Sequence, residues 1–232
     1  MKSKLTFSFA LIFMVGLFNP GEAIDSKDVA FLFKTNGKVE IQKTNTTNWN
    51  RGKRGYRLNS GDKIKTGDNS IAALYFTDDK SMMKVRSRSD VVIHGERKKK
   101  SISKRVFMRA GEVFVSVKKQ NTIFRLETPT GVAAVKGTAF YANFKDGIFK
   151  IFGLSGIVEL INQYGSVLVQ AGQTGTSDGN NPPETKTTDP NDQPDWGGDN
   201  GSQGQEDEMQ IEFKDKDGNI KTLKLQTKSK GN

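Results

Sequence analysis

The chain offers few side chains able to do catalytic or metal-binding chemistry. It has no cysteine and a single histidine, His94, which excludes thiolate chemistry, a His-based metal site and a Ser-His-Asp triad with a spare base. We interpret His94 as a strand residue near a surface. We interpret Thr138 as a strand hydroxyl bonded to backbone, not as a nucleophile. No acid, base and nucleophile form a recognisable set, so the sequence predicts a protein that is not an enzyme and has no cofactor.

Two acidic pairs have the oxygen ligands that Ca²⁺ prefers. They are Asp78-Asp79 and the run Asp215-x-Asp217-Gly218-Asn219. The second lacks the full calcium loop and its distal Glu, and hairpin turns favour the same residue types. We therefore expect turns at both places and no metal site.

A basic stretch is the best binding candidate. Residues 84 to 119 contain twelve Lys or Arg and three acidic residues, a net charge of +9, whereas residues 174 to 208 contain nine acidic residues and one Lys, a net charge of −8. The overall charge of +10 therefore hides an electrically polarised chain. The predicted binding residues are the clustered cations Arg97, Lys98, Lys99, Lys100, Lys104 and Arg105.

Such a cluster fits an anionic partner: lipid, lipopolysaccharide, a cell-wall polymer or an acidic protein. Nucleic acid is not expected for an exported protein, although electrostatics would permit it. Two alternatives stay open. The cluster is a solvated hairpin tip, or the acidic stretch that follows folds back over it. Trp196, within that acidic stretch, is a further candidate as a partner anchor.

The N-terminus has the layout of a secretory signal peptide. Lys2 and Lys4 precede the apolar run 5–18, and Gly21-Glu22-Ala23 supplies small residues for cleavage near Ala23. The alternative is a membrane anchor, but the run is shorter than the roughly 20 residues that span a bilayer. We expect residues 1–23 to be removed, no transmembrane segment afterwards, and a periplasmic or extracellular protein.

The rest of the chain predicts an all-β fold. Short strands recur between glycine turns over residues 28–174, and no window shows a helical period. Asn36-Gly37 has the signature of a type I′ hairpin. A Gly-x-Val motif recurs at Gly37, Gly111 and Gly156, which suggests a solenoid-like stack of similar strand pairs or a twisted sandwich.

The stretch 128–140 is expected to organise this domain. Pro129 gives it a rigid entry, and the backbone-permissive Gly131 and Gly137 frame a small apolar run. Val135 and Phe140 lie on opposite parities, so for both to point into the core the chain must take in one extra residue. We expect a β-bulge at Gly137.

The C-terminal part divides in two. Residues 175–205 are rich in Gly, Pro, Asn and Asp with almost no apolar residues, so we expect a disordered acidic linker. Residues 206–228 alternate strictly around Asp217-Gly218-Asn219, which predicts a β-hairpin.

The order of these motifs resembles the FecR domain, a periplasmic module of bacterial iron-citrate signalling regulators and of many exported proteins. The stretches that carry the resemblance are residues 61–67, 70–74, 109–113, 128–140, 156–159 and 171–173. The resemblance implies a FecR-type stack of short antiparallel strands, with Pro129, Gly131, Gly137, Thr138 and Phe140 as its structural motif. Lys80 departs from the family, which usually has Gly there.

The resemblance implies an exported binding or scaffold module of the bacterial cell envelope. The alternative is an accessory regulator of receptor or iron-uptake signalling in the periplasm. Signalling members of the family are single-pass membrane proteins with a cytoplasmic part that binds a sigma factor. This chain has a signal peptide in that place, so the resemblance implies the fold more firmly than the signalling role.

Overall fold

The computed structural model describes residues 28–98, 101–119 and 122–194, and the backbone of residues 209–214 and 220–225. The predicted signal peptide, Lys99, Lys100 and Trp196 lie outside these residues. The chain divides into two units, residues 1–186 and residues 187–232. The described residues form strands and no helix, which confirms the all-β prediction. In these parts of the chain no helix is long and apolar enough to cross a membrane.

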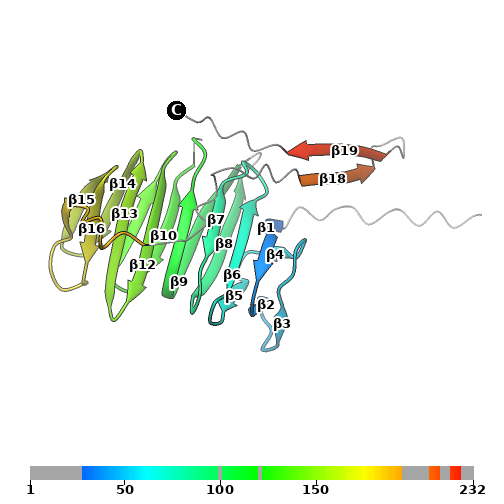
Figure 1. The fold of residues 1–232 in the computed structure, drawn as a ribbon, viewed down its shortest axis with the longest axis horizontal. Coiled ribbons are helices and arrows are strands. Elements are labelled where there is room, and N and C mark those ends of the chain that lie inside the picture. The colour runs from blue at the N-terminus through cyan, green and yellow to red at the C-terminus, as the bar shows by residue number, and fades with distance from the viewer. Residues whose placement is uncertain (1–27, 99–100, 120–121, 195–208, 215–219, 226–232) are drawn as a thin grey trace, which may run out of the picture. The chain divides into compact units, whose positions relative to one another are not determined.

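Strands β1 to β17 form one hydrogen-bonded network. The long strand β9 pairs with strands of two layers, which we call sheet A and sheet B, and the strands lie side by side along the first unit (Figure 1). Sheet A contains, in spatial order, β4 (Arg57–Asn59), β1 (Asp28–Asn36), β6 (Ile71–Phe76), β7 (Met82–Val85), the end of β9 (Ser101–Ser116), β12 (Ala139–Lys145), β13 (Ile148–Ser155) and β16 (Gln173–Ser177).

Sheet B uses the first part of β9. It contains, in spatial order, β3 (Trp49–Arg51), β2 (Val39–Gln42), β5 (Lys63–Thr66), β8 (Asp90–Lys98), β9, β10 (Phe124–Thr128), β11 (Gly131–Val135), β14 (Ile157–Asn162) and β15 (Gly165–Gln170). Only β9 and β10 pair in parallel; every other pairing described is antiparallel. A further strand, β17 (Glu184–Thr187), follows β16.

The two sheets pack face to face around one hydrophobic core. The rings of Phe76 in sheet A and Phe124 in sheet B meet edge to face, with centroids 5.9 Å apart. Both side chains are fully buried, and burial of a side chain of this size contributes about 1.5–3 kcal/mol. The core of this cysteine-free chain therefore supplies the stability that small exported domains often take from disulfides.

The recurring Gly-x-Val motif marks places where the chain passes from one sheet to the other. Gly37 lies between β1 in sheet A and β2 in sheet B, Gly111 lies where β9 changes sheets, and Gly156 lies between β13 and β14. All three have positive φ. The hairpin predicted at Asn36-Gly37 is wrong, because β1 and β2 pair with different strands. The crossings confirm the solenoid-like stack.

The stretch 128–140 also crosses between sheets. Pro129 and Thr130 form a two-residue turn between β10 and β11, since Thr128 pairs with Gly131. The predicted bulge at Gly137 is wrong. Residues 136–138 form a corner that leads from β11 in sheet B to β12 in sheet A. Val135 and Phe140 are both buried because they belong to different sheets, so no extra strand residue is needed.

Gly137 is required at this corner for two reasons. Its φ is +73°, a conformation that costs other residues about 1–2 kcal/mol. A Cβ atom there would also lie 3.1 Å from Cβ of Lys119. The crossing at Gly156 packs against the same corner, where a Cβ atom would lie 3.0 Å from the carbonyl oxygen of Gly137. Two successive sheet crossings are thus stacked in contact.

The ordered β structure continues past the predicted boundary at residue 174. Strand β16 ends at Ser177 and β17 occupies residues 184–187, within the stretch for which we expected a linker. Ser177 is buried, and its Oγ donates to the carbonyl of Thr130 at 2.6 Å. Backbone and hydroxyl hydrogen bonds hold this stretch where apolar side chains are scarce. Residues 195–205 lie outside the described part of the chain.

The predicted C-terminal hairpin is present in the second unit. Strands β18 (Met209–Lys214) and β19 (Ile220–Leu225) pair antiparallel over their whole length, from Met209 opposite Leu225 to Lys214 opposite Ile220. Residues 215–219, between the two strands in the sequence, lie outside the described residues.

Candidate functional site

The predicted basic loop is the tip of a hairpin. Strands β8 and β9 pair up to Lys98 opposite Ser101. Lys99 and Lys100 follow Lys98 in the chain and lie outside the described residues. Lys98 is 63% exposed and its Nζ lies 3.7 Å from Glu96, an exposed pair that contributes little stability. At the described end of the hairpin Lys98 is thus exposed to solvent, and a binding role for this basic stretch stays a prediction.

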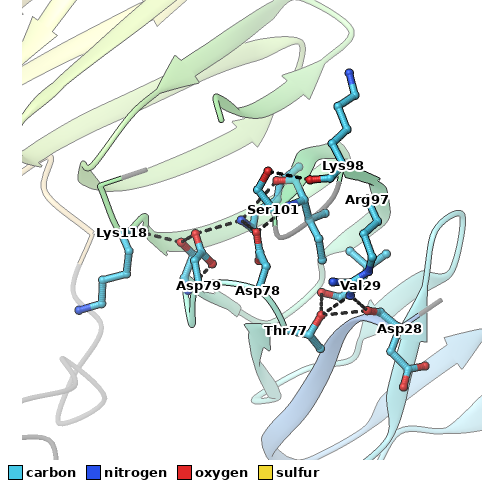
Figure 2. Close-up of polar contacts among 12 residues, drawn as sticks. Asp28, Val29, Thr77, Asp78, Asp79, Arg97, Lys98, Ser101 and Lys118 are labelled. Atoms are coloured by element: carbon cyan, nitrogen blue, oxygen red, sulfur yellow. Dashed lines mark hydrogen bonds and ion pairs between the residues drawn. The ribbon is translucent and has the colours of Figure 1, made fainter. Parts of the chain in front are cut away.

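Arg97 holds the hairpin against the start of sheet A. Its Nη2 donates to the backbone carbonyl of Asp28 at 2.9 Å and to Oγ1 of Thr77 at 3.1 Å (Figure 2). The Thr77 hydroxyl in turn donates to the Asp28 carbonyl at 2.9 Å. The guanidinium therefore has a structural task in addition to its charge.

Lys104 is not part of the exposed basic loop, and this part of the prediction is wrong. Its side chain is 0% exposed, and Nζ lies 2.8 Å from Oδ2 of Asp78 and 2.9 Å from Oδ2 of Asp79. The cause is strand parity: Ile102 and Val106, two residues away on either side, are also fully buried. The inward ammonium also lies 5.5 Å from the centre of the Phe76 ring.

The two aspartates form a buried cluster with Lys104 at the β6–β7 turn. Asp78 Oδ2 accepts a hydrogen bond from the Ile102 backbone N–H at 2.7 Å. Asp79 accepts from the backbone N–H and the hydroxyl of Ser81, at 2.8 and 2.7 Å (Figure 2). The Asp78-Asp79 pair thus binds an ammonium of the same chain. Among the described residues no group of three or more carboxylate or imidazole side chains is placed to hold a metal ion.

The Asp79 carboxylate is held in its charged form. Burial alone would raise its pKa, but hydrogen bonds from the Ser81 side chain and backbone, together with Lys104, outweigh burial and lower the pKa. A lowered pKa means that Asp79 stabilises the fold above its ordinary value of 3.8, and that this contribution is lost as the pH falls through the folded-state pKa.

The turn beside this cluster explains the departure of Lys80 from the FecR pattern. Lys80 has a φ of +58°, the left-handed conformation that glycine adopts without strain. Its backbone N–H donates to the carbonyl of Phe76 at 3.2 Å. Lys80 therefore adopts a backbone conformation that strains a residue with a side chain.

Arg105 lies on the solvent face of sheet B, since it alternates with the buried Lys104 and Val106. Its side chain is 55% exposed and lies 3.8 Å from Glu127. His94 is its partner across the β8–β9 pairing. Burial, and next the charge of Arg105, lower the pKa of His94 below its ordinary 6.5, while Glu127 opposes the shift. His94 is a half-exposed strand residue, as the sequence predicted.

We expect Arg105→Gln to raise the pKa of His94, because it removes a repulsive positive charge. Since His94 is the only histidine, its ring resonances in an NMR pH titration report this pKa without ambiguity. Lys53→Gln, an exposed change on the β3–β4 connection, is the control and leaves the pKa unchanged. An unchanged pKa in Arg105→Gln would show that the two side chains do not interact.

His94 also links stability to pH. With a folded-state pKa below 6.5, the unfolded chain binds more protons in that window, so stability falls as the pH falls from 6.5 through the folded-state value. Because Arg105→Gln raises the folded-state pKa of His94, it narrows the pH range between that pKa and 6.5 over which stability falls.

Sequence reasoning missed two cations on the same face, Arg125 and Lys136. Both are exposed, and Arg125 pairs in register with Arg105 across the parallel strands β10 and β9. The alternation of Arg125 with the buried Phe124 and Leu126 was a usable signal for its orientation. The parallel pairing was not, because nothing local in the sequence encodes it.

Thr138 has the structural role that was predicted. It is buried, and its Oγ1 donates to the carbonyl of Ile157 at 3.1 Å. This bond ties the corner at Gly137 to the strand that follows the next crossing. No base stands among its described hydrogen-bond partners, so its hydroxyl serves packing.

The fold and the surface chemistry define a two-layer β-domain with cations on one hairpin and one sheet face. Residues 62–159 match the family model described as FecR protein. The match confirms the FecR resemblance over this part of the chain, which includes the buried cluster, the hairpin tip, Arg105 and the stretch 128–140.

Among solved structures, two crystal structures of a proposed anti-sigma factor from Parabacteroides distasonis ATCC 8503, at 1.65 and 2.50 Å resolution, are similar to this chain. Each is 15% identical and covers 55% of this chain, with TM-scores of 0.46 and 0.47. The chain spans 60% of the length of that protein. No curated protein matches the sequence.

Proposed function

We propose that this protein is an exported, non-enzymatic FecR-type module that binds another component of the bacterial cell envelope. The observation that carries the proposal is the FecR match over residues 62–159, which encloses an exposed basic hairpin tip built on a rigid base. Export rests on the signal-peptide pattern of residues 1–23. The partner is a protein or an anionic envelope component, because the exposed charge of the tip is positive.

The base gives this tip a fixed position. Arg97 bonds to Asp28 and Thr77 on one side, and the buried Asp78 carboxylate holds the Ile102 backbone on the other. The exposed Lys98 therefore stands on a strand pair that is anchored on both sides. Preorganisation of this kind lowers the entropic cost of binding.

A second candidate function is regulation of a receptor or iron-uptake signalling in the periplasm. The FecR match favours it, since the resemblance implies signalling relatives. Under this proposal the partner is one receptor-like protein.

A pull-down from envelope extract tests both. The bait is the mature chain, and the variant replaces Lys98, Lys99 and Lys100 with Gln while keeping the anchoring Arg97. The matched control replaces Lys53, Arg54 and Lys145, three exposed cations elsewhere. We expect the loop variant to lose most of the captured partner and the control to retain it.

The identity of the partner separates the two functions. Loop-dependent capture of one receptor-like protein favours signalling, and loop-dependent capture of glycan or lipid favours envelope binding. Equal capture by both variants would contradict a role for the hairpin tip.

A further inference from the structure

A second cationic surface lies on sheet B, away from the hairpin tip. Arg105 and Arg125 stand in register on β9 and β10. Their chain neighbours Lys104 and Phe124 are fully buried, so both arginines point to solvent. His94 extends the row on the neighbouring strand β8, opposite Arg105. Three basic side chains thus cross three adjacent strands in one line.

The two arginines placed side by side lower the stability of the sheet, and an anion bound between them would offset this repulsion. Like charges directly opposite each other on paired strands destabilise a sheet. Among the ion pairs of the described residues, Arg105 has a single partner, Glu127 at 3.8 Å, and Arg125 has none. The cations of this face are therefore compensated only in part, by Glu127 beside Arg105.

Apolar side chains border the row. Phe124 pairs with Val135, which pairs with Val158. Ile123, Lys136 and Ile157 each adjoin one of these residues along the chain, so they lie at the same end of the three strands. Ile123 is 44% exposed and Ile157 is 51% exposed. Leu168 on β15 is 56% exposed and faces Glu159. Large aliphatic side chains on a solvent face beside unpaired cations indicate an interaction surface.

We propose that this arginine face (Arg105, Arg125, Lys136, Ile123 and Ile157) docks an extended segment of a protein partner that presents acidic and aliphatic residues on one face, at every second position along the segment. Carboxylates of the segment pair with the two arginines, and its aliphatic side chains cover the two isoleucines. The inference deepens the proposed binding function and rests on it, but uses a surface distinct from the hairpin tip.

The composition of the face favours a peptide over a membrane. Glu127 and Glu159 lie on this same face, next to the cations. A uniformly anionic lipid surface would be repelled by both carboxylates, whereas a peptide can place a neutral residue over each. Arginine also suits bidentate pairing with a carboxylate.

The test measures binding of a short synthetic peptide to the purified mature protein, by calorimetry at low salt. Glutamate and leucine take turns at every second position of the peptide, with serine between them, so that both lie on one face of the extended chain. We expect Arg105→Gln with Arg125→Gln to weaken binding roughly tenfold, since two exposed charge contacts are lost. The matched control, Lys53→Gln with Arg54→Gln, changes the net charge equally and keeps wild-type affinity. A peptide with lysine in place of glutamate is expected not to bind.

His94 supplies an independent readout. An anion beside Arg105 shifts the histidine resonances and raises the pKa of this ring. Equal loss in both double variants, or an unmoved His94 signal at saturation, would overturn the assignment of this face. Binding to phosphatidylglycerol vesicles but not to the peptide would overturn the choice of a protein partner.

These outcomes are separable from those of the proposed function. If the arginine variants bind the peptide as wild type does while envelope capture still depends on Lys98, Lys99 and Lys100, the arginine-face inference is wrong and the proposed function stands.

Discussion

Lys104→Met is expected to lower the free energy of unfolding by about 3–5 kcal/mol, because it leaves two buried carboxylates without their cation. Methionine is unbranched like lysine and only one heavy atom shorter, so most of the loss comes from the missing charge and not from a cavity. Nζ lies within 2.9 Å of both Asp78 and Asp79, and none of its side-chain surface is exposed. Urea unfolding monitored by circular dichroism measures the change.

Lys98→Met is the matched control. It makes the same substitution six positions earlier on the same hairpin, where the side chain is exposed and its pairing with Glu96 is long. Surface changes of this kind stay within about 0.5 kcal/mol. A loss below about 1 kcal/mol in Lys104→Met would contradict the cluster's role in stability.

The same variant predicts a pH dependence. Lys104 is among the causes that lower the pKa of Asp79, so its removal moves that pKa upward. The wild-type advantage from this pairing is complete above the higher of the two folded-state values and disappears below the lower. The stability difference between wild type and Lys104→Met is therefore expected to be largest near neutral pH and to shrink as the pH falls from the raised folded-state pKa of Asp79 in the variant to the lowered one in wild type. A difference that grows on acidification would contradict this linkage.

The placement of Lys104 shows what the sequence could have revealed. Ile102, Lys104, Val106 and Met108 alternate with more polar residues, which is the period of a half-buried strand. This pattern places Lys104 inside, although it does not indicate that the partners are the two carboxylates of the β6–β7 turn. The prediction instead grouped the lysine with its charged neighbours along the chain. The net charge of a sequence window identified surface cations only at positions that strand alternation also places on the outside, as at Lys98 and Arg105.

The sequence was enough to predict an all-β fold, but not which strands pair with one another. Strand content, the turn at Pro129 and the C-terminal hairpin follow from local residue types. The role of the glycines does not follow from local residue types. A glycine with positive φ suits a tight hairpin turn, a bulge or a crossing between two sheets. The local sequence at Asn36-Gly37 was therefore read as a hairpin turn and that at Gly137 as a bulge, although both are crossings. Which strand pairs with which depends on contacts far apart in sequence.

Strand β9 connects the features that bear on function. It carries the inward Lys104 and, one residue later, the outward Arg105. It forms the hairpin that ends at Lys98, and it passes from sheet B to sheet A at Gly111. Both proposed binding surfaces therefore depend on the path of one strand. A change that bends β9 should affect them together, whereas the Gln substitutions above affect them separately.

Gly111→Ala is expected to destabilise the protein by about 3 kcal/mol, the second large effect. The φ of Gly111 is +106°, a conformation that costs an L-residue about 1–2 kcal/mol. An added Cβ atom would also lie only 2.5 Å from the backbone Cα of Ser89, and crowding of this kind costs about 1–3 kcal/mol. Ser89 cannot move freely, since its Oγ accepts a hydrogen bond from the Glu112 N–H at 3.0 Å.

Gly147→Ala separates the two contributions. Gly147 also has positive φ, +77°, at the β12–β13 turn, but no atom lies within 4 Å of its added Cβ. This variant therefore reports backbone strain alone, and we expect a loss of about 1 kcal/mol. The difference between the two variants in urea unfolding measures the crowding at the sheet crossing. Equal losses would show that Ser89 yields to the new side chain, and that β9 can change sheets without the close contact the structure gives it.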